Sequence, residues 1–255
     1  MERMTPVQPP VKSADRTLEV LEALAASPGR RSLVELSRTL DIPKSSLHGI
    51  LRTMARRGWV ETDPTGTRFG LGVRALEVGA AYLDANDAVG LVAGVLDDLS
   101  RQFGEAVHLG RLDGPDVVYL AKRESVHRLR LYSAIGRKLP AHATALGKAL
   151  LAQSPDPDGQ LRWPLPQLTA RTVTDRDALF AELERTRARG YAVDREENTD
   201  GIVCFAIPVP FADPPIDAIS ISVPAARIGP ESEERISGAL ARAMDQLRAA
   251  RSMFS

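Results

Sequence analysis

The chain has 255 residues and a formal net charge of zero at pH 7. Its 44% apolar and 26% charged residues are typical of a globular protein of one or two domains. No apolar run approaches the ~20 residues that cross a bilayer, and the polar, proline-rich start lacks the apolar core of a secretory signal. A single cysteine excludes a disulfide framework and a cysteine-rich metal site. We therefore expect a cytoplasmic protein.

The zero net charge conceals an asymmetry along the chain. Residues 1–74 carry a net charge of +4, and the remaining residues carry −4. The stretch 42–60 contains Lys and Arg residues but no acid. This distribution indicates that only the N-terminal part meets a polyanion such as DNA.

Two helices are expected near the N-terminus. Residues 1–12 contain three prolines and little to bury, so we expect a disordered tail. Ser13 then resembles an N-cap, followed by a helix over 16–26 with a leucine stripe on one face. Ser32 is a second N-cap, with Glu35 at the position that completes a capping box.

A tight break and a third helix follow. Residues 41–43 form the break, and Pro43 suits the first position of a helix that ends at Gly58. Two short strands, 59–62 and 68–71, complete a hairpin. Three short helices followed by a hairpin predict a winged helix-turn-helix.

The face of the third helix opposite its apolar stripe is suited to reading DNA. This face carries small side chains near the N-terminus of the helix and cationic ones further on. The backbone can therefore approach base edges, while arginine pairs with guanine or phosphate. An ordinary solvated helix face is the alternative. The candidate DNA-binding residues, including one from the hairpin, are Lys44, Ser45, Ser46, His48, Gly49, Arg52, Arg56 and Arg68.

The rest of the chain mixes helices and strands. A helical stripe over 73–86 indicates a linker helix, which either pairs between subunits or only joins domains. Beyond it the pattern predicts an α+β domain with an antiparallel sheet. Strands are expected at 106–112, 116–122, 129–133, 202–211 and 217–223, and helices at 89–103, 144–152, 175–189 and 231–251.

Five stretches resemble the IclR family of bacterial transcription regulators. The effector-domain signature is matched by LPAHATALGKALLA (139–152), GYAVDREENTDGIVCFAIPV (190–209) and AISISVPAAR (218–227). The winged helix-turn-helix is matched by SADRTLEVLEAL (13–24) and IPKSSLHGILRTMARRGWVE (42–61). The resemblance implies a DNA-binding domain over 13–72, a linker helix over 73–86 and a GAF-like effector domain over 87–255. It also implies a double-stranded DNA operator and a homodimer or homotetramer.

The resemblance further implies a site for a small-molecule effector, an organic or sugar acid. The matching positions are Ala145, Leu146, Asp194, Cys204, Ser220 and Ser222. Ser220 and Ser222 are two apart on one strand and therefore face the same way, although serines satisfied by neighbouring backbone are the alternative. We expect no arginine in this constellation, so an anion would depend on hydroxyls, amides and a helix N-terminus.

An enzyme is the main alternative from another class. Cys204 could act as a nucleophile with His108 or His142 as base, but its apolar neighbours favour an inert thiol. Glu196 and Glu197 are adjacent rather than on one face, and no phosphate-binding or nucleophile-elbow motif occurs. The four histidines share no metal-ligand spacing, so neither a metal nor a cofactor is expected; a metal site with His142 between domains or between chains is the alternative. A DNA-binding protein with a purely structural second domain is a third alternative.

Overall fold

The computed structural model describes residues 10–127 and 133–254, with side chains up to Arg251. Its contacts divide the chain into two compact units, Met1–Ala85 and Asn86–Ser255. The expected tail, except for its last residues, lies outside the described residues, as does most of the strand expected at 129–133. None of the described helices is long and apolar enough to cross a membrane.

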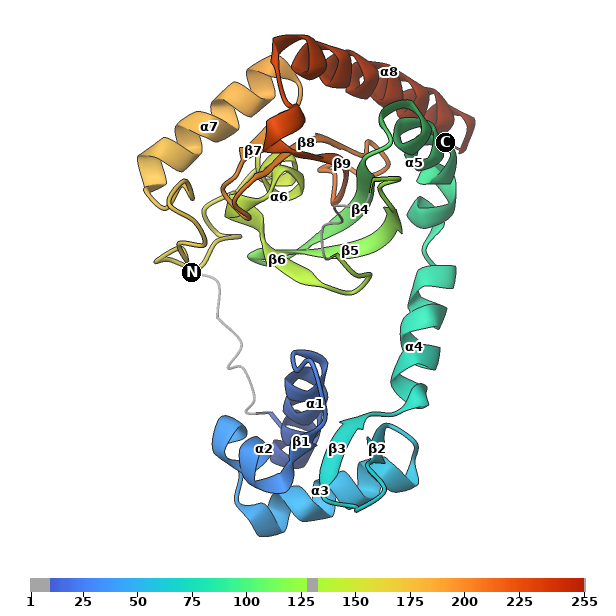
Figure 1. Ribbon diagram of the computed structural model, residues 1–255, viewed down its shortest axis with the longest axis vertical. Helices are drawn as coiled ribbons and strands as arrows, with labels where there is room; N and C mark the ends of the chain where they lie inside the picture. The colour runs from blue at the N-terminus through green and yellow to red at the C-terminus, as the bar shows by residue number, and fades with distance from the viewer. Residues whose placement is uncertain (1–9, 128–132, 255) are drawn as a thin grey trace, which may run out of the picture. The chain divides into compact units, whose positions relative to one another are not determined.

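The N-terminal unit has the winged helix-turn-helix arrangement expected from the sequence (Figure 1). Its elements are α1 (Lys12–Ala25), α2 (Leu33–Leu40), α3 (Lys44–Arg56), β1 (Arg31–Ser32), β2 (Val60–Thr62) and β3 (Arg68–Leu71). The strands pair antiparallel in the order β1–β3–β2, and the two-residue β1 was not expected. Val20, Leu36 and Leu47 from the three helices meet in one buried core.

One expected helix cap is confirmed and another is wrong. Ser32 and Glu35 form the capping box: the Ser32 Oγ accepts from the Glu35 N–H at 3.2 Å, and Glu35 accepts from the Ser32 N–H at 2.7 Å. Ser13 does not cap α1, because that helix already begins at Lys12 after Val11. Ser13 instead lies in the first turn of α1, where its carbonyl accepts a hydrogen bond from the Thr17 hydroxyl.

Backbone contacts hold the start of α4 (Val73–Asp84) against the residues that follow α3. The Gly72 N–H donates to the Trp59 carbonyl at 2.9 Å, and the Arg74 N–H donates to the Gly58 carbonyl at 3.3 Å. A Cβ at Gly72 would lie 2.2 Å from the Gly58 oxygen, so only glycine fits this crossing.

Within the described part of the chain, the C-terminal unit is built on a six-stranded antiparallel sheet of order β6–β5–β4–β9–β8–β7. Its strands are β4 (Ala106–Asp113), β5 (Asp116–Arg123), β6 (Lys138–Pro140), β7 (Ala192–Arg195), β8 (Ile202–Pro208) and β9 (Asp217–Pro224). The short edge strands β6 and β7 were not expected. The expected α+β class, with an antiparallel sheet in the second half, is confirmed.

A short helix, α6 (Ala145–Leu151), lies inside the curve of this sheet, and every one of its residues is buried (Figure 1). A 3-10 turn, η1 (Ala141–Ala143), leads into it. The helices α5 (Asp87–Phe103) and α8 (Pro230–Phe254) contact the sheet and each other on its outer side. This enclosure explains why every residue of α6 except Lys148 is apolar.

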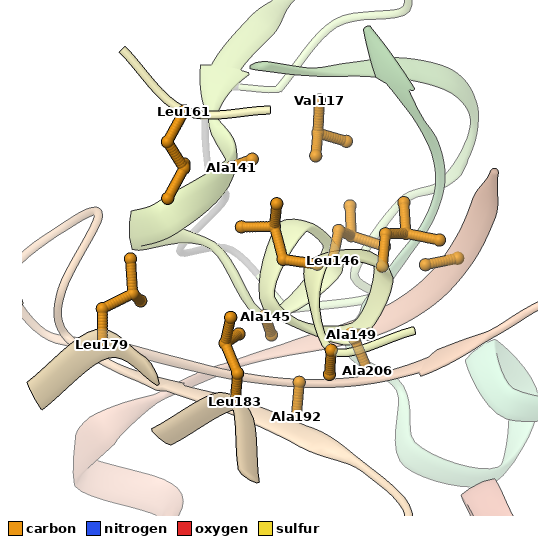
Figure 2. Close-up of a cluster of buried hydrophobic side chains, with 14 of the residues drawn as sticks. Val117, Ala141, Ala145, Leu146, Ala149, Leu161, Leu179, Leu183, Ala192 and Ala206 are labelled. Atoms are coloured by element: carbon orange, nitrogen blue, oxygen red, sulfur yellow. The ribbon is translucent and has the colours of Figure 1, made fainter. Parts of the chain in front are cut away.

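The core around α6 is completed by α7 (Arg176–Arg189), as Figure 2 shows. Leu179 and Leu183 are one turn apart on α7; Leu183 points toward Ala145 and Ala192, and Leu179 points toward Leu161 in the same cluster. Both leucines are fully buried. The helix that carries part of the functional site is thus held between the sheet and α7.

Gly147 tests how tightly α6 fits. A Cβ at this position would lie 2.1 Å from the Ala141 carbonyl oxygen, a backbone atom that can move only with η1. Gly147→Ala is therefore expected to destabilise the C-terminal unit by ~1–3 kcal/mol, as overpacking does. The measurement is thermal unfolding followed by circular dichroism.

Gly90→Ala is the matched control, since Gly90 is a helical, exposed glycine with nothing within 4 Å of an added Cβ. It is expected to stabilise by ~0.5–1 kcal/mol through helix propensity. A Tm for Gly147→Ala equal to that of the wild type would show that η1 can shift to accommodate the added methyl group without loss of stability.

Candidate functional site

The face of α3 expected to read DNA is its solvent face. Leu47, Leu51 and Met54 are buried on the opposite side of the helix. Of the eight candidate residues, Ser46 and Gly49 are half-buried and the others are exposed, namely Lys44, Ser45, His48, Arg52, Arg56 and Arg68. No acidic residue lies in the first turn of α3. The helix therefore presents an exposed, acid-free surface of small and cationic side chains.

The structure adds two arginines that sequence reasoning missed. The Arg16 Nη1 in α1 donates to the Ser46 Oγ at 3.3 Å, which places a guanidinium beside the start of α3. Arg30 precedes β1, and its carbonyl accepts from the Arg68 Nη1 at 3.0 Å. The Arg16 guanidinium thus lies at this surface, whereas Arg30 contacts Arg68 only through its carbonyl and its own guanidinium pairs with Glu61 at 3.7 Å. Both contacts join segments distant in sequence, which helical periodicity does not reveal.

In the C-terminal unit, all six predicted effector residues line one cavity of about 40 Å³. Asp194, Cys204 and Ser222 stand in one row, because each is the register partner of the next across β7, β8 and β9. The Cys204 Sγ donates to the Ser222 Oγ at 3.3 Å. Ala145 and Leu146, at the start of α6, form a facing wall.

Other residues that the sequence did not assign to the site line the same cavity. Ser220 is the register partner of His108 in β4, so the pairing of these strands was the available signal. The expectation that the constellation contains no arginine is wrong, because β5 and the turn before β6 bring Arg137 to the cavity. The polar residues missed are His108, Tyr119, Ser133, Arg137, Asn198 and Thr199.

His108 is a buried, neutral imidazole in the cavity wall. Its ring stacks on Tyr119 with centroids 4.6 Å apart, and its Nε2 lies 2.9 Å from the Ser133 Oγ. Burial, followed by the nearby charge of Lys122, lowers the pKa of His108 to about 4. Burial also raises the pKa of the Tyr119 hydroxyl above its ordinary value. Both rings are therefore uncharged near pH 7.

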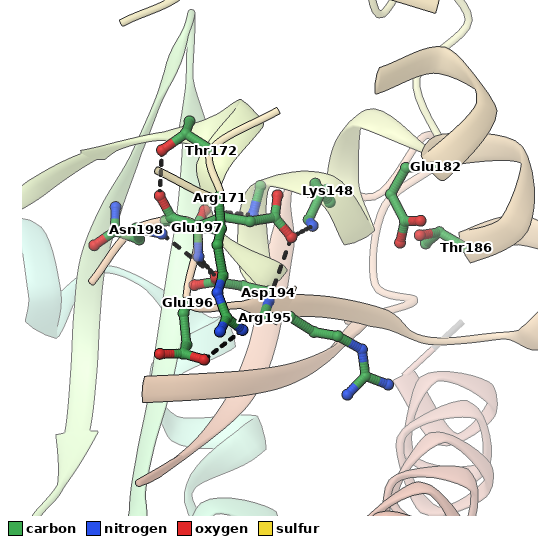
Figure 3. Close-up of polar contacts among 12 residues, drawn as sticks. Lys148, Arg171, Thr172, Glu182, Thr186, Asp194, Arg195, Glu196, Glu197 and Asn198 are labelled. Carbon is green, nitrogen blue, oxygen red and sulfur yellow. Dashed lines mark hydrogen bonds and ion pairs between the residues drawn. The ribbon is translucent and has the colours of Figure 1, made fainter. Parts of the chain in front are cut away.

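Behind the cavity lies a buried ion pair, shown in Figure 3. Lys148 of α6 is fully buried, and its Nζ lies 2.6 Å from the Glu197 Oε1. The Glu197 N–H donates to the Asp194 Oδ1 at 2.7 Å. Burial raises the pKa of the Asp194 carboxyl to about 7, against the opposing effect of Lys148.

The chemistry for an enzyme is not assembled in this cavity. Glu196 pairs with Arg171 at 2.6 Å while Glu197 pairs with Lys148, so the adjacent acids serve separate ion pairs. Burial raises the pKa of the Cys204 thiol well above its ordinary value, which leaves it a poor nucleophile. Within the described residues, no three His, Cys, Asp or Glu side chains gather as metal ligands.

The raised pKa of Asp194 predicts a pH-dependent effect of its replacement. An unfolded Asp ionises near pH ~3.9, so between about pH 4 and 7 the folded chain holds a proton that the unfolded chain has lost. The stability that this proton supplies is lost as the pH rises through 7. Asp194→Asn removes the buried charge, while the asparagine Oδ1 can still accept from the backbone.

Asp194→Asn is therefore expected to raise the Tm of the C-terminal unit at pH 8, by roughly 2–4 °C for each kcal/mol recovered. At pH 5 the gain should be about a third as large, because the native carboxyl is protonated there while the pH lies only about one unit above the pKa of the unfolded carboxyl, ~3.9. Thermal unfolding at the two pH values measures this difference, with the exposed Asp200→Asn as control. An equal Tm shift at both pH values would contradict the assigned burial effect.

Comparison with known proteins identifies the family. The profile described as "IclR helix-turn-helix domain" matches residues 13–64. The profile described as "Bacterial transcriptional regulator IclR C-terminal" matches residues 80–249. Together these matches cover both units and most of the chain.

Individual relatives agree with the profiles. The chain is 34% identical to the HTH-type transcriptional regulator XynR of Escherichia coli, covering 79% of this chain and 81% of the relative. It is 34% identical to the transcriptional repressor IclR of Escherichia coli, covering 86% and 82%. A crystal structure of an IclR transcriptional regulator from Alicyclobacillus acidocaldarius superposes with a TM-score of 0.83 at 26% identity, covering 95% of this chain and 100% of that one. The chain belongs to the IclR family, whose members are DNA-binding transcription regulators with an effector domain rather than enzymes.

Proposed function

We propose that the N-terminal winged helix-turn-helix, residues 13–72, binds a specific operator and that a small-molecule effector in the C-terminal cavity changes this binding. The linker helix, 73–86, joins the two, and residues 87–255 form the effector-binding domain. The convergence of buried polar side chains on one cavity carries the effector half of the proposal. A purely structural domain has no need of such a lining, because buried polar groups cost free energy unless they are paired.

The proposed effector is a small organic or sugar acid. Ser220 and Ser222 are in position to hold its polar end, with Ala145 and Leu146 as the opposite wall and Cys204 beside them. The volume of about 40 Å³ accommodates only a few non-hydrogen atoms unless the lining moves, which favours a small molecule. A constellation of single hydrogen bonds supports micromolar affinity, roughly −8 kcal/mol.

On the DNA side, the residues divide by what they can reach. Ser45, His48 and Arg52 occupy the exposed part of α3 that would face base edges in a major groove, with the half-buried Ser46 and Gly49 beside them. Lys44, Arg56 and Arg68 at the ends of the helix and on the hairpin are placed for phosphates, which fix the position of the domain on DNA.

We further propose a homodimer or homotetramer that acts in the cytoplasm, the compartment of bacterial DNA. None of the residues of α4 is buried, although Val73, Leu76 and Tyr82 are large and more than half exposed. A helix with such an apolar surface supports pairing with a second copy of the chain. Two DNA-binding heads would also match a palindromic or repeated operator.

The base and phosphate roles predict different losses on mutation. Arg52→Ala is expected to cost ~1–3 kcal/mol on the operator and to reduce the preference for operator over random DNA. Arg68→Ala should weaken operator and random DNA equally and reduce the slope of log K against log salt by about 0.9 per lost phosphate contact. Fluorescence anisotropy across a salt series, with a duplex selected by the protein from a random pool, measures both effects. Full retention of operator preference by Arg52→Ala would exclude a base contact.

The effector role predicts that Ser220→Ala and Ser222→Ala reduce the response of DNA binding to effector. Each lost bond is worth ~0.5–1.5 kcal/mol when neutral and ~1.5–3 kcal/mol when charged. A thermal-shift screen of sugar acids, aromatic acids and dicarboxylates supplies the effector, and DNA affinity is then compared with and without it. Ser237→Ala, on the exposed side of α8, is the control. If DNA binding by both serine variants still responds normally to the effector, the effector site lies elsewhere. If DNA binding by the wild type does not respond to any of these acids, a purely structural domain is favoured.

A further inference from the structure

The cavity has two chemically different ends. At one end Asp194, Cys204 and Ser222 form a row across three strands, with carboxyl, thiol and hydroxyl groups. At the other end Ser220 lies opposite His108 in the pairing of β9 with β4. A ligand that fills the cavity must therefore present different groups to the two ends.

Two cationic side chains lie near the His108 end, one of them already paired with a carboxylate. Arg137 lines the cavity, and its carbonyl accepts from the N–H of Tyr119, whose ring stacks on His108. Lys122 is the register partner of His108, and its Nζ donates to the Ser133 carbonyl at 2.8 Å while pairing with Glu124 at 2.7 Å. The opposite end holds the Asp194 carboxyl, in front of the Lys148–Glu197 pair. A carboxylate is therefore favoured at the His108 end and disfavoured beside Asp194.

His108 supplies an independent observation, because one of its nitrogens is unsatisfied. The side chain is 1% exposed, and its Nε2 is engaged by Ser133. Its Nδ1 is buried without a hydrogen-bond partner among the described residues. A buried polar atom of this kind is costly unless a ligand or water satisfies it. If the Ser133 hydroxyl donates to Nε2, the proton resides on Nδ1, which can then donate to a carboxylate oxygen.

We propose that the effector is a hydroxy acid that lies across the cavity, with its carboxylate at Arg137 and the His108 Nδ1 and a hydroxyl at the Asp194–Ser222 end. This inference rests on the proposed function and specifies the ligand class and its orientation. Arg137 acts as the residue that selects for a carboxylate. Asp194 and Ser222 then favour a hydroxyl group, because the carboxyl and the hydroxyl can each form a further hydrogen bond beyond their contacts with Glu197 and Cys204.

The experiment measures binding to the full chain by isothermal titration calorimetry and thermal shift. The probes are glycolate, glycerate and gluconate, each compared with its primary amide and with the matching acid that lacks the hydroxyls: acetate, propionate and hexanoate. The wild type is expected to bind at least one hydroxy acid and to prefer it to both analogues by about tenfold, the effect of losing one charged or buried bond. Absence of binding by all three hydroxy acids would overturn the inference.

Variants at Arg137 test the orientation. This side chain is exposed, so Arg137→Gln should fold normally. It is expected to weaken the hydroxy acid by about tenfold while leaving its amide nearly unaffected, and Arg137→Lys should restore part of the loss. Lys138→Gln removes a neighbouring exposed cation that pairs instead with Asp113, and it is expected to change neither affinity. Equal losses for acid and amide in Arg137→Gln would overturn the carboxylate assignment.

His108 provides a second, independent arm. His108→Asn can place an amide donor near the Nδ1 position and should retain part of the acid affinity, whereas His108→Phe keeps the ring but removes the donor. If both variants bind the acid as tightly as the wild type does, the His108 Nδ1 does not contact the carboxylate. An effector of another class that still changes operator binding through the serines would leave the proposed function standing while this inference fails.

Discussion

A single buried ion pair organises the effector-binding unit. The ammonium of Lys148 is fully enclosed at the centre of the curled sheet, and Glu197 neutralises it across a distance of 2.6 Å. The same glutamate accepts at its carbonyl from the Thr172 hydroxyl and donates its N–H to Asp194. Loss of one member would leave an uncompensated buried charge, which costs about 3–5 kcal/mol. The Lys148–Glu197 contact therefore links α6, the loop that follows β7 and the acidic end of the cavity.

The features that could be predicted from the sequence are those fixed within a few residues. The Ser32–Glu35 capping box is a local pattern, and its spacing alone locates the start of α2. The alternation that places Ser220 and Ser222 on one face follows from strand geometry, so both reach the cavity together. The assignment of Ser13 shows the limit of local reasoning, since an available serine does not cap a helix that starts one residue earlier.

The features that could not be predicted depend on pairing between distant segments. The strands β6 and β7 are too short to show a periodic pattern, yet β6 brings the turn that carries Arg137 to the cavity. His108 lies beside Ser220 only because β4 pairs with β9, more than a hundred residues later in the chain. The family resemblance located one wall of the cavity, while its cationic wall required the register of the sheet.

The glycine at the junction of hairpin and linker has a mechanical consequence. Gly72 crosses the Gly58 carbonyl so closely that no Cβ fits, and two backbone hydrogen bonds fasten this crossing. The start of α4 is thus held closely against Gly58 and Trp59, the residues that follow α3. A rotation of α4 is therefore expected to be transmitted to the segment that follows α3 rather than absorbed at the junction.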